Sequence, residues 1–161
     1  MRLFLVFMLI SSFAIAQQNE QKLAYQYFIN GEYNKAVSIY EELNNEHFSV
    51  AYYIPYFGSL LKTEQFKEAE KLAKKVAKIY PLSLNYQLEI GIAQEKGGNQ
   101  KKADRTYKKL FKNFTGKQNQ TINLAATFSR YNMYAEALNV YQIAEKLNPT
   151  SHYGTQKAQL F

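Results

Sequence analysis

The sequence has no cysteine and no tryptophan among its 161 residues, and it holds only 3 prolines and 7 glycines. The lack of cysteine excludes disulfides, thiolate nucleophiles, zinc–cysteine sites and a lipid-modified cysteine. So few prolines and glycines favour long helices with short turns over a sheet protein rich in turns. Apolar residues make up 47% of the chain, which argues against wholesale disorder.

Histidine is scarce as well, since only His47 and His152 occur, and they lie far apart along the chain. A metal site needs several converging ligands, and a Ser/His/Asp site needs an imidazole beside a nucleophile motif, so we expect neither. The glycine pair at residues 97–98 suits a turn between helices rather than a phosphate-binding loop. Carboxylates such as Glu68 and Glu70 have the spacing of solvated surface groups, for which the raised pKa of a general acid is not expected. The sequence therefore predicts a protein that is not an enzyme and holds no cofactor or metal.

The beginning of the chain has the three parts of a secretory signal peptide. Arg2 supplies the positive charge, residues 3–10 form a short apolar run, and Ala14 and Ala16 are small residues that a signal peptidase accepts. We expect residues 1–16 to be removed by cleavage after Ala16. The alternative is an uncleaved membrane anchor, which would need a longer apolar run to span roughly 30 Å of hydrocarbon. The mature chain is thus expected to be exported, periplasmic or secreted, with no transmembrane span.

The rest of the chain is repetitive. Four similar stretches each place an alanine five positions after a turn residue, and the alanines are Ala36, Ala69, Ala103 and Ala137. Their spacings of 33, 34 and 34 residues indicate a repeat of one structural unit. Apolar residues within each unit recur with the 3.6-residue period of a helix, as in the first stripe, which consists of Leu23, Ala24, Tyr27 and Phe28. The pattern therefore predicts two helices in each unit and an all-α fold class.

This pattern resembles the tetratricopeptide repeat, an antiparallel helix pair of about 34 residues with a small residue where the helices cross and an aromatic residue one turn later. The matching pairs are Ala36 with Tyr40, Ala103 with Tyr107, and Ala137 with Tyr141. The resemblance implies a right-handed α-solenoid of about four such repeats over residues 17–151. The expected units cover about 17–49, 50–83, 84–117 and 118–151.

Two parts of the chain depart from the regular pattern. In the second unit, Ala73 replaces the aromatic residue, Glu64 replaces the turn glycine, and bulky Phe57 stands where the first helix usually has a small residue. Residues 152–161 look like the start of a further or capping helix. This segment either packs back on the fourth unit or leads into a longer natural protein, and we favour the longer protein.

Charge is unevenly distributed along the chain. Residues 17–49 carry 2 basic and 5 acidic groups, whereas residues 84–117 carry 8 basic and 3 acidic groups. The basic face of residues 67–112 has two interpretations, a solvated helix face that aids solubility or a surface that attracts an acidic partner. That partner would be an anionic lipid headgroup, a polyanionic glycan or an acidic protein. We expect no nucleic-acid partner, because the chain has no recognised nucleic-acid-binding motif.

The resemblance also implies where a partner protein or peptide would bind, because the first helices of such repeats form a concave wall. The candidate residues on this wall are Gln21, Tyr25, Phe28, Ile54, Lys62, Asn85, Ile92, Lys96, Asn119 and Arg130. Lys62, Lys96 and Arg130 recur near the ends of successive first helices. They either form a basic line that faces an acidic ligand or extend their charges into solvent.

The leading functional hypothesis is an exported, non-enzymatic scaffold or adaptor that binds a peptide or partner protein in its concave groove. The alternative is an extracytoplasmic sensory or interaction module of a longer transmembrane regulator or of an envelope or secretion assembly. A third hypothesis, an enzyme or a glycan-binding protein, needs a polar pocket or an exposed aromatic cluster that the sequence does not place.

Overall fold

A computed structural model of the chain describes residues 18–46 and 48–160, and this part consists of helices, turns and loops without a strand. The predicted all-α class of consecutive helix pairs is confirmed. The predicted signal peptide of residues 1–16 lies outside the described residues, as do His47 and Phe161. The chain divides into two compact units, of which the first ends at Ala69 and the second begins at Glu70.

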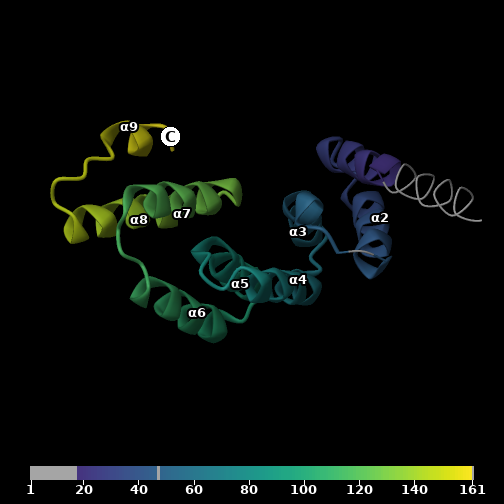
Figure 1. Ribbon diagram of the computed structural model, residues 1–161, viewed down its shortest axis with the longest axis horizontal. Coiled ribbons are helices and arrows are strands. Elements are labelled where there is room, and N and C mark those ends of the chain that lie inside the picture. Colours follow the sequence, from purple (N-terminus) through teal and green to yellow (C-terminus); the bar gives the residue numbers. More distant parts are fainter. Residues whose placement is uncertain (1–17, 47, 161) are drawn as a thin grey trace, which may run out of the picture. The chain divides into compact units, whose positions relative to one another are not determined.

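The first unit contains a helix over residues 18–29, α2 (Tyr33–Glu46), a 3-10 turn η1 (Val50–Tyr52), α3 (Tyr53–Lys62) and the beginning of α4 (Phe66–Ile79) (Figure 1). Helix α2 packs on α3. Their contact is rich in tyrosine, because the Tyr40 ring lies 5.6 Å from both the Tyr52 and the Tyr56 ring. Burial of these rings supplies much of the apolar core of this unit.

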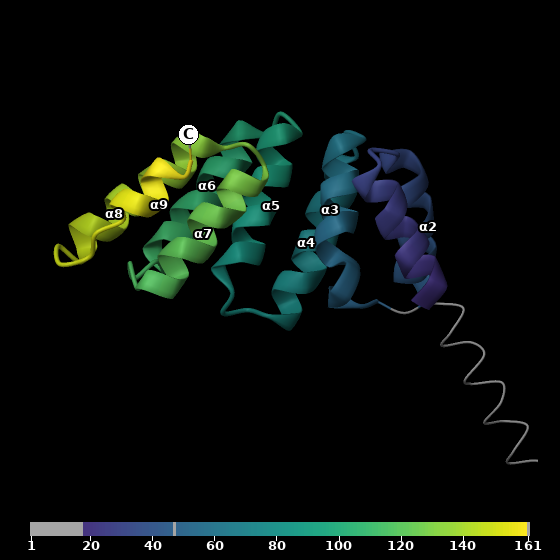
Figure 2. The same cartoon turned by 90° about the horizontal axis from the view of Figure 1, so that it is seen from above.

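The second unit contains the rest of α4, then α5 (Leu84–Lys96), α6 (Gln100–Lys112), α7 (Gln118–Arg130), α8 (Tyr134–Leu147) and α9 (Gly154–Ala158). Helix α5 packs against α6, α7 packs against α8, and α5 also contacts α7. Figure 2 shows these two helix pairs side by side. The contact between α5 and α7 buries apolar surface that neither pair could bury alone, which is the packing expected of stacked repeats.

The turn between the two helices of each pair has the same geometry in all four cases. The turn residues adopt a positive φ, which is 77° at Gly31, 60° at Glu64, 77° at Gly98 and 61° at Asn132. In each turn the next amide N–H bonds to the carbonyl five residues earlier, and these bonds join Glu32 to Tyr27, Gln65 to Leu60, Asn99 to Gln94 and Met133 to Phe128. This is the Schellman ending of a helix, which satisfies carbonyls that would otherwise lack a partner.

The repeat alanines have the environment that their spacing predicts, because Ala36, Ala69, Ala103 and Ala137 are all fully buried. Small side chains at these positions let neighbouring helices approach closely. Leu23, which the first apolar stripe placed in the core, is instead exposed. It lies in the first described helix, where no preceding helix pair within the described residues covers it.

The C-terminal segment packs back on the fourth helix pair, which is one of the two outcomes expected for residues 152–161. The Tyr153 ring lies 5.1 Å from the Tyr141 ring of α8 and is almost fully buried. An ion pair of 2.8 Å joins Lys157 of α9 to Glu145 of α8. Across the part of the chain that the structure covers, each helix is too short or too polar to cross a bilayer.

Candidate functional site

The first unit brings three of the predicted partner-binding residues together. Tyr25 and Phe28 lie on the first described helix with ring centroids 6.2 Å apart. Phe28 also lies against α3, because a Cβ added at Gly58 would be only 3.2 Å from the Phe28 ring. Ile54 precedes Gly58 by one helical turn on α3. We call Tyr25, Phe28 and Ile54 the apolar cluster.

The apolar cluster is open to solvent although its side chains are large and apolar. Tyr25 is 51% exposed and Ile54 is 46% exposed, while Phe28 is half-buried. Two further predicted residues flank the cluster, since half-buried Gln21 lies one turn before Tyr25 and exposed Lys62 lies at the end of α3. These five residues lie on the first described helix and on α3, and their role in binding a partner stays a prediction.

The predicted residues of the second unit do not form an equivalent set. Lys96 and Asn119 are exposed and Asn85 is half-buried, so they remain available to a partner. Ile92 is a wrong prediction, because it is fully buried in the core. Helix α5 packs against both α6 and α7. It is therefore buried on more than the single face that an amphipathic surface helix buries.

Arg130, another predicted residue, lies beside a carboxylate of its own chain. Its Nη1 atom is 3.6 Å from Oε1 of Glu89, a residue that is only 2% exposed. The Tyr131 hydroxyl donates a 2.7 Å hydrogen bond to the same oxygen. Burial and the Glu89 charge raise the pKa of Tyr131 well above its usual value. The positive charge of Arg130 is therefore partly offset, which weakens its case as a free ligand for an acidic partner.

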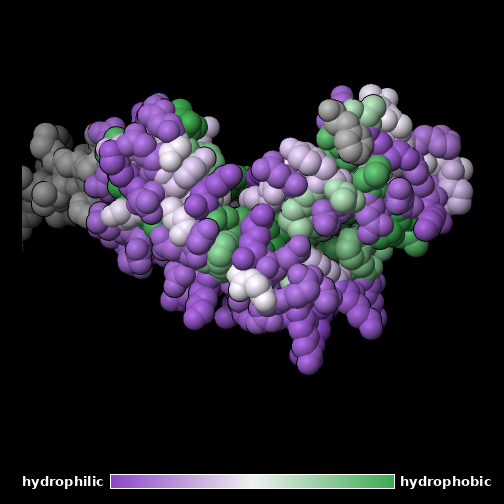
Figure 3. Space-filling view, turned by 180° about the vertical axis from the view of Figure 1, so that it is seen from behind, coloured by the Kyte–Doolittle hydropathy of each residue, from purple (hydrophilic) through white to green (hydrophobic). Residues whose placement is uncertain are grey.

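The second unit carries another surface feature. The sequence predicted a basic face there but did not predict a groove. A groove of about 640 Å³ lies in the second unit and is lined by residues of α4, α5 and α6. Its cations are Lys74, Lys78, Lys102, Arg105 and Lys109, and its apolar residues are Ala77, Pro81 and Ile90. We call this the basic groove. Figure 3 shows hydrophilic side chains projecting from the edge of the molecule that α6 forms.

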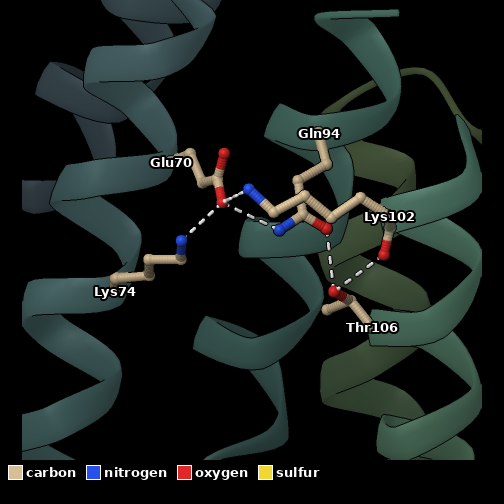
Figure 4. A network of polar contacts seen from close by, with 5 residues as sticks. All are labelled: Glu70, Lys74, Gln94, Lys102 and Thr106. Carbon is tan, nitrogen blue, oxygen red and sulfur yellow. Dashed lines mark hydrogen bonds and ion pairs between the residues drawn. The ribbon is translucent and has the colours of Figure 1, made fainter. Parts of the chain in front are cut away.

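A network of polar contacts joins four residues of the basic groove to Glu70 (Figure 4). Oε1 of Glu70 is 2.6 Å from the amines of both Lys74 and Lys102, and it accepts a 2.9 Å hydrogen bond from the Gln94 amide. The Thr106 hydroxyl donates a 2.8 Å bond to the Gln94 carbonyl oxygen. The network joins α4, α5 and α6, so it ties together three consecutive helices.

The expectation that Glu70 is a solvated surface carboxylate is wrong, because its side chain is only 16% exposed. Burial alone would raise its pKa, but the bonds from Lys102, Lys74 and Gln94 outweigh burial and lower the pKa to about 2. The sequence did hold one signal for this pairing. Glu70 and Lys102 are 32 residues apart, close to one repeat period, so opposite charges on successive second helices can meet.

These surfaces offer binding chemistry rather than acid–base chemistry. The Glu70 carboxylate stays ionised at neutral pH, and a cationic groove of this kind attracts anionic groups. Within residues 18–46 and 48–160, no three His, Cys, Asp or Glu side chains gather closely enough to hold a metal ion.

Comparison with known proteins identifies the repeat directly. Residues 86–116 match the family model described as the tetratricopeptide repeat. The match spans most of α5, the Gly98 turn and all of α6, and so falls within the predicted third unit of 84–117. The match confirms the predicted tetratricopeptide repeat over these residues. A comparison with curated proteins finds no match to the chain.

Proposed function

We propose that this tetratricopeptide repeat protein is an exported scaffold that holds a peptide or partner protein on the apolar cluster of its first unit. The repeat itself indicates a protein–protein interaction scaffold, a fold that is typically not enzymatic. The observation that carries the proposal is the exposure of Tyr25 and Ile54 next to Phe28 on two neighbouring helices. Adjacent exposed apolar side chains mark interaction surfaces more often than scattered ones do.

The chemistry of the apolar cluster fits a partner with apolar anchor residues. Full burial of one large apolar side chain contributes about 1.5–3 kcal/mol, and tyrosine is enriched among the residues that dominate interface energies. Lys62 at the end of α3 adds a positive charge beside the cluster. An apolar peptide with an acidic flank would therefore satisfy both features.

The test combines site-specific crosslinking with a binding measurement. A photo-crosslinking amino acid is placed at residue 25 or 54 of the protein in its native host. We expect it to capture a partner, which mass spectrometry then identifies. With that partner purified, the Tyr25→Ala/Phe28→Ala variant is expected to bind at least about tenfold more weakly, which corresponds to roughly 1.4 kcal/mol. Circular dichroism should show unchanged helicity.

A matched control removes an exposed tyrosine and an exposed aliphatic residue elsewhere. Tyr80→Ala/Leu82→Ala does so in the second unit, where both side chains are exposed. Because Phe28 is half-buried, Tyr25→Ala/Ile54→Ala provides a second variant that changes only exposed positions. Equal affinity of the partner for the wild-type chain and for both cluster variants would show that the apolar cluster is not the binding site.

Export is the second part of the proposal, and it is supported by the sequence of residues 1–16. Mass spectrometry of the protein recovered from its native host should show a chain that begins at Gln17. Fractionation should find it outside the cytoplasm. A cytoplasmic protein that retains Met1 would contradict this part and leave the binding proposal unaffected.

A further inference from the structure

We propose that the basic groove binds an acidic peptide segment of a partner protein. This contact goes beyond the proposed function, because it uses the second unit and none of the residues of the apolar cluster. The partner class follows from the charge of the groove, its size and its apolar lining residues.

Positive charge in the groove exceeds negative charge. Of its five cations, Lys74 and Lys102 contact the Glu70 carboxylate. Lys78, Arg105 and Lys109 have no carboxylate within ion-pair distance in the described part of the chain. Like charges that share one groove repel each other, and an anionic ligand would relieve that repulsion.

The groove is large enough for a segment of polypeptide. Its volume of about 640 Å³ lies within the roughly 300–1,000 Å³ typical of ligand sites and is far larger than one phosphate or one carboxylate needs. Its lining includes the apolar residues Ala77, Pro81 and Ile90 as well as the cations. An extended segment that alternates carboxylates with apolar side chains would contact both kinds of residue. A bare anion would leave the apolar residues in contact with water.

Two lysines of the groove already bind one carboxylate of this chain. The Glu70 carboxylate contacts the amines of Lys74 and Lys102 and accepts a hydrogen bond from the Gln94 amide, all within 2.9 Å. Among the remaining cations of the groove, the Arg105 guanidinium can hold a carboxylate through two parallel hydrogen bonds. Glu70 thus shows that these lysines and Gln94 can bind a carboxylate, and it also neutralises part of the positive charge that a peptide would contact.

The experiment measures binding of a fluorescein-labelled ten-residue peptide of alternating Glu and Leu by anisotropy, at about 0.15 M salt so that long-range attraction is screened. The test variant is Lys78→Ala/Arg105→Ala/Lys109→Ala. The control variant is Lys71→Ala/Lys101→Ala/Lys108→Ala, which removes three exposed cations of α4 and α6 that do not line the groove. Both variants lower the net charge equally, and circular dichroism checks that both stay folded.

We expect the test variant to bind the peptide at least about tenfold more weakly and the control variant to lose less than about threefold. The matched peptide of alternating Gln and Leu should bind at least about tenfold more weakly than the Glu peptide. Glu70→Gln should tighten binding of the Glu peptide by about threefold, because it releases Lys74 and Lys102.

Three results would overturn the proposal. Equal losses in the test and control variants would mean that net charge alone attracts the peptide. Equal affinity for the Gln peptide would mean that the cations are not involved. Tighter binding to vesicles of anionic lipid or to inorganic polyphosphate, lost in the test variant, would assign the groove to a lipid surface or a free polyanion. None of these results bears on the apolar cluster, so the two proposals fail separately.

Discussion

The Tyr107 ring of α6 lies directly over Gly91 of α5, and a Cβ added at Gly91 would be 2.7 Å from Cδ1 and 2.9 Å from Cζ of that ring. The ring is held in place from two sides. Its hydroxyl donates a 2.7 Å hydrogen bond to Glu95, and its centroid lies 6.1 Å from the Phe128 ring of α7. The close approach of α5 and α6 therefore depends on the absence of a side chain at residue 91.

We predict that Gly91→Ala destabilises the protein by about 1–3 kcal/mol, because the added methyl group must displace a held aromatic ring. This loss exceeds the gain of up to about 1 kcal/mol that alanine brings to a helix interior. Urea unfolding followed by circular dichroism measures the difference. Gly154→Ala is the control, since a Cβ there meets no atom within 4 Å. A Gly91→Ala variant as stable as the wild type would contradict the close packing.

Two tyrosines at equivalent repeat positions should respond oppositely to loss of the hydroxyl. The Tyr40 hydroxyl is buried and has no hydrogen-bond partner among the described residues, and burial raises its pKa, whereas the Tyr107 hydroxyl is bonded to Glu95. We expect Tyr40→Phe to be neutral or to stabilise by about 1 kcal/mol, and Tyr107→Phe to cost about 1 kcal/mol. Thermal unfolding of the two variants side by side tests this, and the reverse order of stabilities would refute it.

Glu64 adopts a left-handed backbone conformation that its Cβ disfavours. Glu64→Gly should relieve this strain, and we expect a net gain of about 0.5–1 kcal/mol after the greater entropy of the unfolded glycine chain is subtracted. The reciprocal change Gly98→Glu, in the equivalent turn of the next helix pair, should cost a similar amount. Denaturant unfolding measures both. If Glu64→Gly proves less stable than the wild type, side-chain contacts of Glu64 outweigh the backbone strain.

The acid sensitivity of the fold should depend on Glu70. Its pKa falls from an ordinary 4.5 to about 2 in the folded chain, so its contribution is complete above about pH 4.5 and disappears as the pH falls through about 2. We expect Glu70→Gln to cost about 1–2 kcal/mol at neutral pH, because solvent screens the half-exposed lysines, and the difference to shrink towards pH 2. Unfolding between pH 7 and pH 2 measures this. A constant difference would show that the ion pairs do not stabilise the fold.

Much of the fold was predictable because equivalent positions of a helical repeat recur at a constant spacing in the sequence. Residues that line the crossing of two helices must be small in every unit, so the alanines at 33- to 34-residue intervals report one shared environment. The lysines on the outer faces of α4 and α6 are exposed for the same reason, since a 3.6-residue stripe leaves the opposite face to solvent.

The candidate site was predictable only where its contacts are local. Tyr25 and Phe28 lie within one turn of a single helix, and the sequence placed them together. Ile92 could not be assigned in this way, because the extra contact of α5 with α7 decides its burial. The pairing of Arg130 with Glu89 spans two helix pairs, and no periodic pattern in one helix reveals it.

The Glu70 network lies between these two cases. Its contact with Lys74 is an ordinary pair one turn apart, but the contacts with Gln94 and Lys102 come from helices 24 and 32 residues further along the chain. The alignment of successive second helices indicates the contact with Lys102, but not the contact with Gln94, which lies on α5.

The four equivalent Schellman turns have a consequence for protein engineering. Gly98 and Asn132 occupy the same point of two turns that lie 34 positions apart in the second unit. Excising residues 98–131, or inserting a second copy of them, would place one turn residue at the position of the other, and the two have similar positive φ angles. The array should therefore accept shortening or lengthening by whole modules at these junctions, whereas a splice in the middle of a helix would interrupt its hydrogen bonds.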